Sequence, residues 1–345
     1  MRSPLNKRLF RELRGEFGKY LVIFILMTLT IGMVSGFLVA DGSMIQAYEE
    51  SFEKYNIENG HFRTEKKMNN AQIQDIEDLG IKLYENYYVE EALTNGSTMR
   101  IFKNRDEVNK VCLMKGKMPE KPGEIGIDRM YADNNDLSVG DEIESGGHTW
   151  KITGLVALSD YSALFSNNND SMFDSVKFGV SVVCPEEFDS YKADQLNYSY
   201  AWKYNTEPKN EKAEKDISED LMEDVAKEVT LEEFVPRYTN QAIIFTGDDM
   251  GGDRSMMIVL LYIIIVIMAF VFAITTSNTI RKEANVIGTL RASGYTRGEL
   301  IRHYMAAPVF VTFIGAIIGN VIGYTVGKDY CAGLYYGSYS LPTYV

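Results

Sequence analysis

Three long segments without a charged residue most constrain what this chain can fold into. Tyr20–Ala40, Met256–Thr276 and Met305–Val326 are strongly apolar and contain no Asp, Glu, Lys, Arg or His. Each has about the 20 residues that a helix needs to cross roughly 30 Å of hydrocarbon. We therefore predict three transmembrane helices, although the mean hydropathy of the whole chain is only −0.16.

The first apolar segment has an alternative interpretation as the core of a signal peptide, because basic residues precede it. However, the segment is longer than a usual signal core. Its end reads GFLVADGSM, which contains no Ala-x-Ala cleavage site. We therefore expect an uncleaved membrane anchor.

The charges that flank these segments predict the membrane topology. Residues 1–40 have a net charge of +4 and residues 277–303 a net charge of +3, whereas residues 41–254 carry 23 basic and 43 acidic side chains, a net charge of −20. Short basic flanks stay in the cytoplasm, and a large acidic domain can be translocated. We expect a multi-pass protein of the cell membrane, with a cytoplasmic N-terminus and residues 41–254 outside.

These boundaries divide the chain into seven parts. The first is an amphipathic helix, because leucines and a phenylalanine recur every four residues between basic residues from Leu5 to Phe17; a simple basic flank of the anchor is the alternative. The expected parts are a cytoplasmic amphipathic N-terminal helix (1–19), transmembrane helix 1 (20–40), an extracytoplasmic domain (41–254), transmembrane helix 2 (255–276), a cytoplasmic connector (277–304), transmembrane helix 3 (305–326) and the start of an extracytoplasmic loop (327–345).

The extracytoplasmic segment alternates helical and strand-like patterns, which predicts an α+β domain. Alternating or β-branched runs indicate strands, and proline after Cys184 can open a helix. The expected strands are Glu124–Asp128, Thr149–Val156 and Gly179–Val183, and the expected helices lie near 44–55, 69–79, 185–193 and 210–228. The last helix is strongly acidic, and we interpret its charges as a solvated face. The segment FTGDDMGGDR, before the second apolar segment, is expected to be a glycine-rich joint.

Small residues recur every four positions in two of the apolar segments. The third segment contains IGAIIGNVIGYTVGK, and the first contains a similar series. Small residues at this spacing let helix backbones approach closely in lipid, although glycine is also common in membrane helices generally. We predict helix-packing faces formed by Gly32 and Gly36, with Thr28 and Ala40, on the first helix and by Gly315, Gly319, Gly323 and Gly327 on the third.

The sequence contains no recognisable catalytic, cofactor or metal motif. The Gly-Lys pairs lack the following Ser or Thr of a phosphate-binding loop, and no Gly-x-Ser-x-Gly or Ser-x-x-Lys pattern occurs. His61, His148 and His303 lie far apart in the sequence, and Asp248, Asp249 and Asp253 match no cation-binding loop pattern. The acidic composition offers no basic face for nucleic acid. We therefore expect no cofactor, metal or nucleic-acid partner and no catalytic activity.

Two of the three cysteines lie in the extracytoplasmic segment. Cys112 and Cys184 could form a disulfide there, and Cys331 would remain unpaired. Isolated buried thiols are the interpretation that we favour, because three cysteines do not make a disulfide framework.

The connector RKEANVIGTLRASGYTRGELIRHY, residues 281–304, lies between the second and third apolar segments. Its apolar positions predict a short helix with one buried side, and Gly294 is a suitable residue to end it. Thr296 and Glu299 form a capping box for the next helix, with Tyr295 and Leu300 placed for a hydrophobic staple. A short exposed helix of this kind can dock into a groove of another protein.

This connector resembles the cytoplasmic coupling region of the FtsX-like permeases of ABC transporters, which include the MacB-type transporters. The shared pattern is an acidic residue followed by Ile-Gly, Leu-Arg-Ala and Gly. It is present here as Glu283, Ile287, Gly288, Leu290, Arg291, Ala292 and Gly294. A second similarity lies in the outer segment, where GKMPEKPGEIGID and LSVGDEIESGGHTWKITGLVA resemble the signature of the family's MacB-like core domain.

The resemblance implies a fold and a function. The fold is an α-helical membrane protein with an extracytoplasmic α+β domain, MacB-like, inserted between transmembrane helices 1 and 2. The function is that of a permease subunit, for export or for mechanotransmission. Its partners would be a separate ABC ATPase subunit, which the seven connector residues contact, a second permease copy or half, the lipid bilayer, and an extracellular substrate or partner that the sequence does not identify.

Two departures from the family pattern deserve notice. Many members place the acidic residue directly before Ile-Gly, whereas Val286 occupies that position here and Glu283 lies about one turn earlier. The family unit also has four membrane helices, and this sequence contains three. We therefore expect a fragment, or the first part of a longer permease, that lacks the fourth membrane helix.

Other functions remain compatible with the residues. Within the permease class, the protein could regulate extracellular cell-wall hydrolases. From other classes, it could be a membrane-anchored receptor or sensor whose connector binds a signalling protein, or an ion-coupled transporter, although the uncharged membrane segments argue against the last. The connector residues could also pack only against the protein's own membrane helices.

Overall fold

The computed structural model describes residue 11 and residues 14–343, and the following description is confined to them. Most of the amphipathic helix predicted over residues 1–19 lies outside these residues. The chain divides into two compact units, Met1–Met44 with Gly251–Leu334 and Ile45–Met250 with Tyr335–Val345. Each unit is described by itself.

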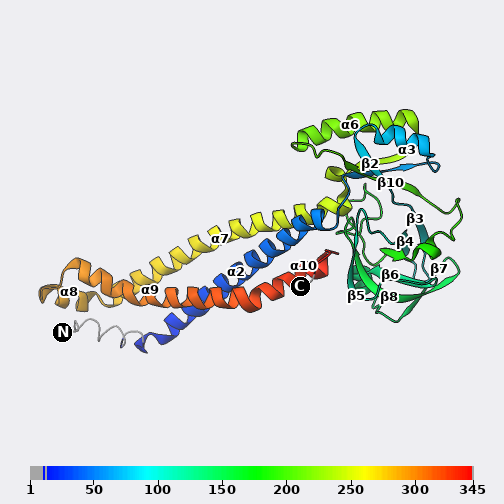
Figure 1. Cartoon of the computed structure of the whole chain (residues 1–345). Helices are drawn as coiled ribbons and strands as arrows, with labels where there is room; N and C mark the ends of the chain where they lie inside the picture. Colours follow the sequence, from blue (N-terminus) through cyan, green and yellow to red (C-terminus); the bar gives the residue numbers. More distant parts are fainter. Residues whose placement is uncertain (1–10, 12–13, 344–345) are drawn as a thin grey trace. The chain divides into compact units, whose positions relative to one another are not determined.

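Long apolar helices form the first unit (Figure 1). In the described residues, three helices are long and apolar enough to cross a membrane: Phe17–Lys54, Gln241–Lys282 and Arg297–Ser338. They are α2 (Phe17–Lys54), α7 (Gln241–Lys282), and a third helix made of α9 (Arg297–Ile322), the π-helical turn η2 (Gly323–Gly327) and α10 (Lys328–Ser338). The short helix α8 (Ala284–Ala292) links α7 to α9. The predicted order of apolar helices around an inserted α+β domain is confirmed.

Each of these helices is longer than its apolar segment, which corrects three expectations. Residues 44–55 are not a separate helix, because α2 continues to Lys54; FTGDDMGGDR is not a joint, because it lies inside α7; and the chain after residue 327 is helical as far as Ser338 rather than a loop. A helix that has already nucleated gains a hydrogen bond with each added residue, so the three glycines of this segment, at about 1 kcal/mol each, do not stop it.

Gly247 has a packing role that the sequence did not reveal. A Cβ atom at this position of α7 would lie 2.5 Å from a ring carbon of Tyr48 on α2, so any larger residue would collide with the tyrosine. The Tyr48 hydroxyl donates a hydrogen bond to the carbonyl oxygen of Ile243 at 3.0 Å. The glycine is therefore needed where the two helices meet in the second unit.

Two β-sheets form the second unit. The antiparallel four-stranded sheet has the order β11-β1-β10-β2, and the mixed sheet has the order β3-β4-β9-β6-β8-β5 with β7 paired to β8. In the mixed sheet β4 pairs with β9 and β6 with β8 in parallel. The strands are β1 (Gly60–Thr64), β2 (Ile81–Glu85), β3 (Tyr88–Ala92), β4 (Thr98–Lys103), β5 (Val111–Gly116), β6 (Glu124–Asp128), β7 (Glu142–Ser145), β8 (His148–Leu158), β9 (Phe178–Val183), β10 (Tyr198–Tyr204) and β11 (Leu231–Pro236).

The helices of this unit largely follow their sequence patterns. They are α3 (Asn70–Glu77), α4 (Arg129–Asn134), α5 (Pro185–Phe188), α6 (Glu211–Glu228) and the 3-10 turn η1 (Arg237–Thr239). The predictions near 69–79 and 210–228 are confirmed by α3 and α6, and Pro185 opens α5. The predicted helix over 185–193 is too long, because α5 ends at Phe188. The three predicted strands are present as β6 and as parts of β8 and β9.

One hydrophobic core joins the two sheets. It contains Phe62, Tyr200 and Trp202, all fully buried, and the ring of Trp202 stacks on that of Phe234 with centroids 4.7 Å apart. Alternation along the strands places these side chains on one face. Burial of several aromatic rings of this size contributes much of the stability of a domain.

Candidate functional site

The connector between α7 and α9 forms the short helix and the turn that its sequence predicts, but the predicted buried side is wrong, because no residue of α8 is buried. Gly294 adopts the left-handed conformation, with φ of +96°. The Tyr295 amide donates to the carbonyl oxygen of Leu290 at 3.2 Å, and the Gly294 amide donates to that of Arg291 at 3.1 Å. These two bonds make a Schellman motif, which ends α8 sharply and requires glycine or asparagine at this position.

The next helix begins with the predicted capping box. The Glu299 amide donates to the Thr296 hydroxyl at 3.3 Å, and the Thr296 amide donates to the Glu299 carboxylate at 2.8 Å. These backbone hydrogen bonds and the adjacent hydroxyl lower the pKa of Glu299 below its usual value. The reversal of the chain between α8 and α9 is therefore fixed locally, at both helix ends.

The seven predicted coupling residues lie together on this reversal, and most of them are accessible. No residue of α8 is buried. The side chains of Ile287 and Leu290 are half-buried, whereas Gly288, Arg291 and Ala292 are exposed. A Cβ atom added to Gly288 would find nothing within 4 Å. The close approach that glycine permits at Gly288 is therefore not used by the described part of this chain.

The two charged members of the set have contacts within the connector. The Tyr304 hydroxyl donates to the Glu283 carboxylate at 2.5 Å, and an Arg291 guanidinium N–H donates to the Tyr295 carbonyl oxygen at 3.1 Å. Glu283 also precedes the first residue of α8, where a carboxylate favours the positive end of the helix dipole. Both residues therefore stabilise the conformation of the connector through these hydrogen bonds.

The glycines of the first and third membrane helices face each other in the first unit. A Cβ atom on Gly319 would lie 2.8 Å from the Thr28 carbonyl oxygen, and one on Gly323 would lie 2.6 Å from the Gly32 carbonyl oxygen. Real Cβ atoms do not approach backbone this closely, so the two helices can adopt this spacing only with glycine at these positions.

The same contact extends to Gly36 and Gly327, at one end of the predicted series. A Cβ atom on Gly36 would lie 2.8 Å from the backbone of Gly327. At the other end, a Cβ atom on Gly315 would lie 3.3 Å from the Cβ atom of Met27. The Gly315 carbonyl oxygen accepts a hydrogen bond of 3.4 Å from the Thr28 hydroxyl. The π-helical turn η2 begins and ends at the last two glycines of this face, Gly323 and Gly327.

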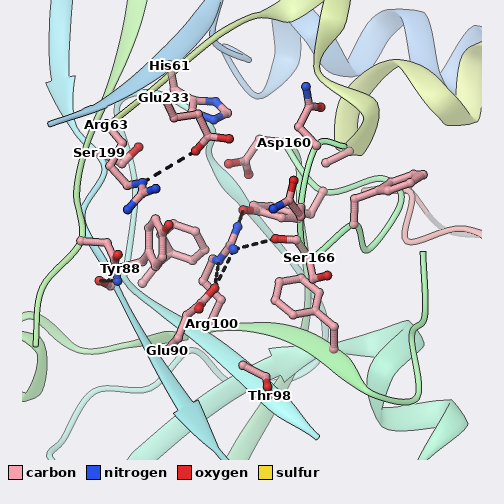
Figure 2. Close-up of a pocket in the computed structure, with 18 of the residues that line it drawn as sticks. His61, Arg63, Tyr88, Glu90, Thr98, Arg100, Asp160, Ser166, Ser199 and Glu233 are labelled. Carbon is pink, nitrogen blue, oxygen red and sulfur yellow. Dashed lines mark hydrogen bonds and ion pairs between the residues drawn. The ribbon is translucent and has the colours of Figure 1, made fainter. Parts of the chain in front are cut away.

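The second unit contains a polar cavity of about 620 Å³ that the sequence analysis missed. Its walls come from both sheets and from the segment 160–178, as Figure 2 shows. Near its centre the Arg100 guanidinium donates to Glu90 at 2.6 Å, to the Tyr161 hydroxyl at 2.6 Å and to the Ser166 carbonyl oxygen at 2.8 Å. The guanidinium also packs over the ring of Tyr88, 4.5 Å from its centroid.

A buried ionic network lies behind one wall of this cavity. The His61 imidazole contacts Glu58 at 2.6 Å, and the Glu58 carboxylate accepts a second bond from Asn109 at 2.6 Å. Burial opposes the imidazolium, but the adjacent Glu58 carboxylate raises the pKa of His61 above its usual value. Nearby, Asp160 and Arg105 make a two-pronged ion pair at 2.7 and 2.8 Å.

The last turn of α10 and the residues that follow it are held in the second unit at the carboxyl end of β6. The Arg129 guanidinium donates to the carbonyl oxygens of Tyr336 and Tyr339 at 2.6 and 2.7 Å and packs over the Tyr336 ring at 3.7 Å. The Ser340 hydroxyl donates to Asp128 at 2.5 Å. We call these contacts the C-terminal clasp. Ser340 and Leu341 are fully buried there.

Sequence reasoning did not find the cavity or the clasp, because both depend on pairings between distant segments. Glu90 and Arg100 stand opposite each other only because β3 and β4 pair in one register. The one signal was Asp128 before α4, since aspartate after a strand is a common helix cap.

Metal binding finds no support among the described residues, where no group of three or more His, Cys, Asp and Glu side chains could hold an ion. Of the three aspartates considered from the sequence, Asp249 accepts a hydrogen bond from the Tyr339 hydroxyl. Cys112 and Cys184 are free and buried, and Cys331 is half-exposed.

The outer signature has a backbone explanation. Gly116 has a φ of +81°, and a Cβ atom there would lie 2.3 Å from the Thr153 carbonyl oxygen. Gly154, its partner across the sheet, would place a Cβ atom 2.4 Å from the Lys117 carbonyl oxygen. The Glu124 carboxylate accepts bonds from the amides of Glu120 and Lys121 and so fixes the preceding turn.

Comparison with known proteins gives a family match for the C-terminal part of the chain. Residues 258–345 match the model described as FtsX-like permease C-terminal. This segment includes α8 and the whole connector, so the resemblance indicated by the connector residues is confirmed over this range. No curated protein gave a significant match.

Two solved structures are similar to about half of the chain. One is the periplasmic region of MacB from Actinobacillus actinomycetemcomitans, with 11% identity over 49% of this chain and 85% of that chain and a TM-score of 0.28. The other is the extracellular domain of the noncanonic ABC-type transporter YknZ from Gram-positive bacteria, with 11% identity over 50% of this chain and 98% of that chain and a TM-score of 0.27.

Proposed function

We propose that this protein is the permease subunit of an ABC transporter, in which α8 docks on a separate ATPase subunit. ATP hydrolysis on that subunit would move the extracytoplasmic α+β domain, for export or for mechanotransmission. The observation that carries this proposal is the position of the predicted coupling residues. Five of them lie on the short helix α8, of which no residue is buried, and Glu283 and Gly294 flank it.

The connector is suited to transmit force because two local motifs fix the turn between α8 and α9. The Schellman motif at Gly294 and the capping box at Thr296 hold α8 relative to the start of α9 without help from a partner. A helix held in this way changes shape little when it is pushed, so movement of α8 would pass into α7 and α9. Half-buried Ile287 and Leu290 supply the apolar anchors that an interface of this size needs.

The family match supports the same assignment, because it covers α7 from residue 258, α8 and α9 together. On this proposal the permease itself has no catalytic activity. Two permease copies or halves and two ATPase subunits would form the working unit in the cell membrane, with the N-terminus and α8 in the cytoplasm and the α+β domain outside.

Substitution at Gly288 tests the proposal directly. A Cβ atom at Gly288 meets nothing within 4 Å in this chain, so Gly288→Trp should leave folding and membrane abundance normal. It should nevertheless block close approach of the ATPase. We expect less ATPase to co-purify per molecule of permease. Leu290→Ala should weaken ATPase binding by about 2 kcal/mol, as the loss of an apolar anchor typically does.

Gly252 provides a matched control. It also has open space around a Cβ atom, but it lies on the part of α7 that we expect outside the membrane. Gly252→Trp should bind the ATPase normally. The proposal is wrong if both variants, Gly288→Trp and Leu290→Ala, bind the ATPase normally per molecule but have low abundance. That result would mean that these residues only pack within the protein. Absence of any co-purifying ATPase would favour the receptor interpretation.

A further inference from the structure

We propose that the polar cavity of the α+β domain binds a neutral, hydroxyl-rich ligand, a mono- or disaccharide unit. The cavity lies between the two sheets and has about 620 Å³, within the roughly 300–1,000 Å³ range of small-molecule sites. The inference is independent of ATPase coupling.

Most charges of the cavity are already balanced by neighbours, and the two others that line it, Asp174 and Lys177, are exposed to solvent. Arg100 is paired with Glu90, Asp160 with Arg105, and His61 with Glu58. Arg63 lies 2.6 Å from Glu232 and 3.7 Å from Glu233. A charged ligand would have to disrupt one of these pairs and leave its partner exposed to a poorly solvated environment, which is costly. The cavity therefore favours an uncharged ligand.

The remaining polar groups suit a ligand that has many hydroxyls. Carboxamides and hydroxyls line the walls, and each can both donate and accept a hydrogen bond. They include Asn86, Asn197 and Asn240 from three different segments, together with Thr98 and Ser199. A sugar hydroxyl also donates and accepts, so it can bind such groups in several orientations, whereas an apolar ligand would offer no partner to their remaining donor and acceptor sites.

Aromatic rings supply the apolar part of the site. Tyr88, Phe102 and Tyr161 line the cavity, and the rings of Phe102 and Tyr88 pack with centroids 5.6 Å apart. Arg100 is stacked on Tyr88 and so holds this ring in place. The C–H faces of a pyranose ring are apolar, and they can pack against such a ring while the hydroxyls at its edge reach the polar walls.

Direct binding to the full-length protein in lipid nanodiscs tests the inference. The probes are N,N′-diacetylchitobiose, cellobiose and, as a zwitterionic comparison, alanyl-alanine. We expect one of the disaccharides to bind and alanyl-alanine not to bind. Thr98→Trp should fill part of the cavity and weaken binding, whereas Thr94→Trp, at an exposed position that does not line the cavity, should leave binding unchanged.

A second pair of variants guards against misfolding of Thr98→Trp. Tyr88→Leu should weaken disaccharide binding by roughly tenfold, the effect of losing an aromatic contact of about 1.4 kcal/mol. Tyr198→Leu removes another half-buried strand tyrosine that does not line the cavity, and its binding should be unchanged. The proposal is wrong if neither disaccharide binds at millimolar concentration, if alanyl-alanine binds instead, or if folded Tyr88→Leu binds as the wild type does. ATPase co-purification is unaffected by any of these results.

Discussion

Gly323 of the third membrane helix lies against Gly32 of the first, so closely that a Cβ atom on Gly323 would be 2.6 Å from the Gly32 carbonyl oxygen. The apolar surfaces that these helices present elsewhere would pack equally well against lipid tails. Close backbone contact is therefore the interaction that can favour one helix pairing over another in a bilayer. The glycine face determines which helices meet, and the longer apolar side chains do not.

Substitution at Gly323 should accordingly destabilise the helix pair. We expect Gly323→Leu to separate the first and third helices and to lower the stability of the membrane unit by about 1–3 kcal/mol, as overpacking does elsewhere. Ile318→Leu, at a position that is 38% exposed, should have little effect. Unfolding by denaturing detergent, followed by helical circular dichroism, measures both. Equal stability of the two variants would mean that these glycines have no specific role in helix packing.

The sequence predicted those features that depend on neighbours along the chain. The apolar segments, the end of α8 at Gly294 and the capping box at Thr296 all follow from residues within one or two helical turns. The lengths of the helices were less predictable. Nothing near Lys54 or Gly247 shows that the helix continues beyond the hydrocarbon, because this continuation depends on packing such as that of Gly247 on Tyr48.

Features that join distant segments could not be predicted from one sequence. The Arg100–Glu90 pair and the clasp on Tyr336 require the strand register and the path of the chain after α10. Arginine and glutamate are common surface residues, so neither gives a local signal. The glycine faces were an exception, since each one is visible along its own helix.

Cysteine labelling should establish the topology that the flanking charges predict. In a Cys331→Ser background, where Cys112 and Cys184 are buried, exposed Lys282 and Arg297 can each be replaced by cysteine, and Lys212 on α6 provides an outer site. A membrane-impermeant maleimide added to intact cells should label Lys212→Cys only. The other two should react only after the membrane is opened. Labelling of Lys282→Cys or Arg297→Cys in intact cells would reverse the topology and remove α8 from the ATPase.

Removal of the clasp arginine should release the segment after α10. Arg129→Ala leaves the carbonyl oxygens of Tyr336 and Tyr339 without their buried donor, which should cost about 2–4 kcal/mol of the stability of the α+β unit. The matched control is Asp133→Ala, which breaks only the exposed part of the Arg129 ion pair and should cost less than about 1 kcal/mol. Hydrogen exchange at residues 336–341 should rise in Arg129→Ala alone. Unchanged protection there would show that the segment is held by other contacts.

The buried Asp128 carboxyl should make the stability of the α+β unit depend on pH. Burial raises the pKa of Asp128 to about 6, although the Ser340 hydroxyl and the amides of Tyr131 and Met130 oppose the rise. The folded protein therefore binds a proton more tightly than the unfolded chain, so this residue's contribution to stability falls as pH increases from about 4 to about 6.

Asp128→Asn should remove this dependence, because asparagine stays neutral and can still cap α4. The stability of the variant relative to the wild type should increase by on the order of 3 kcal/mol between pH 4 and pH 7. Tryptophan fluorescence during denaturation measures it cleanly, since Trp150 and Trp202, both tryptophans of the chain, lie in the α+β unit. A difference between variant and wild type that stays constant with pH would mean that Asp128 is ionised in the folded protein throughout this range, and that its contact with Ser340 is a charged one.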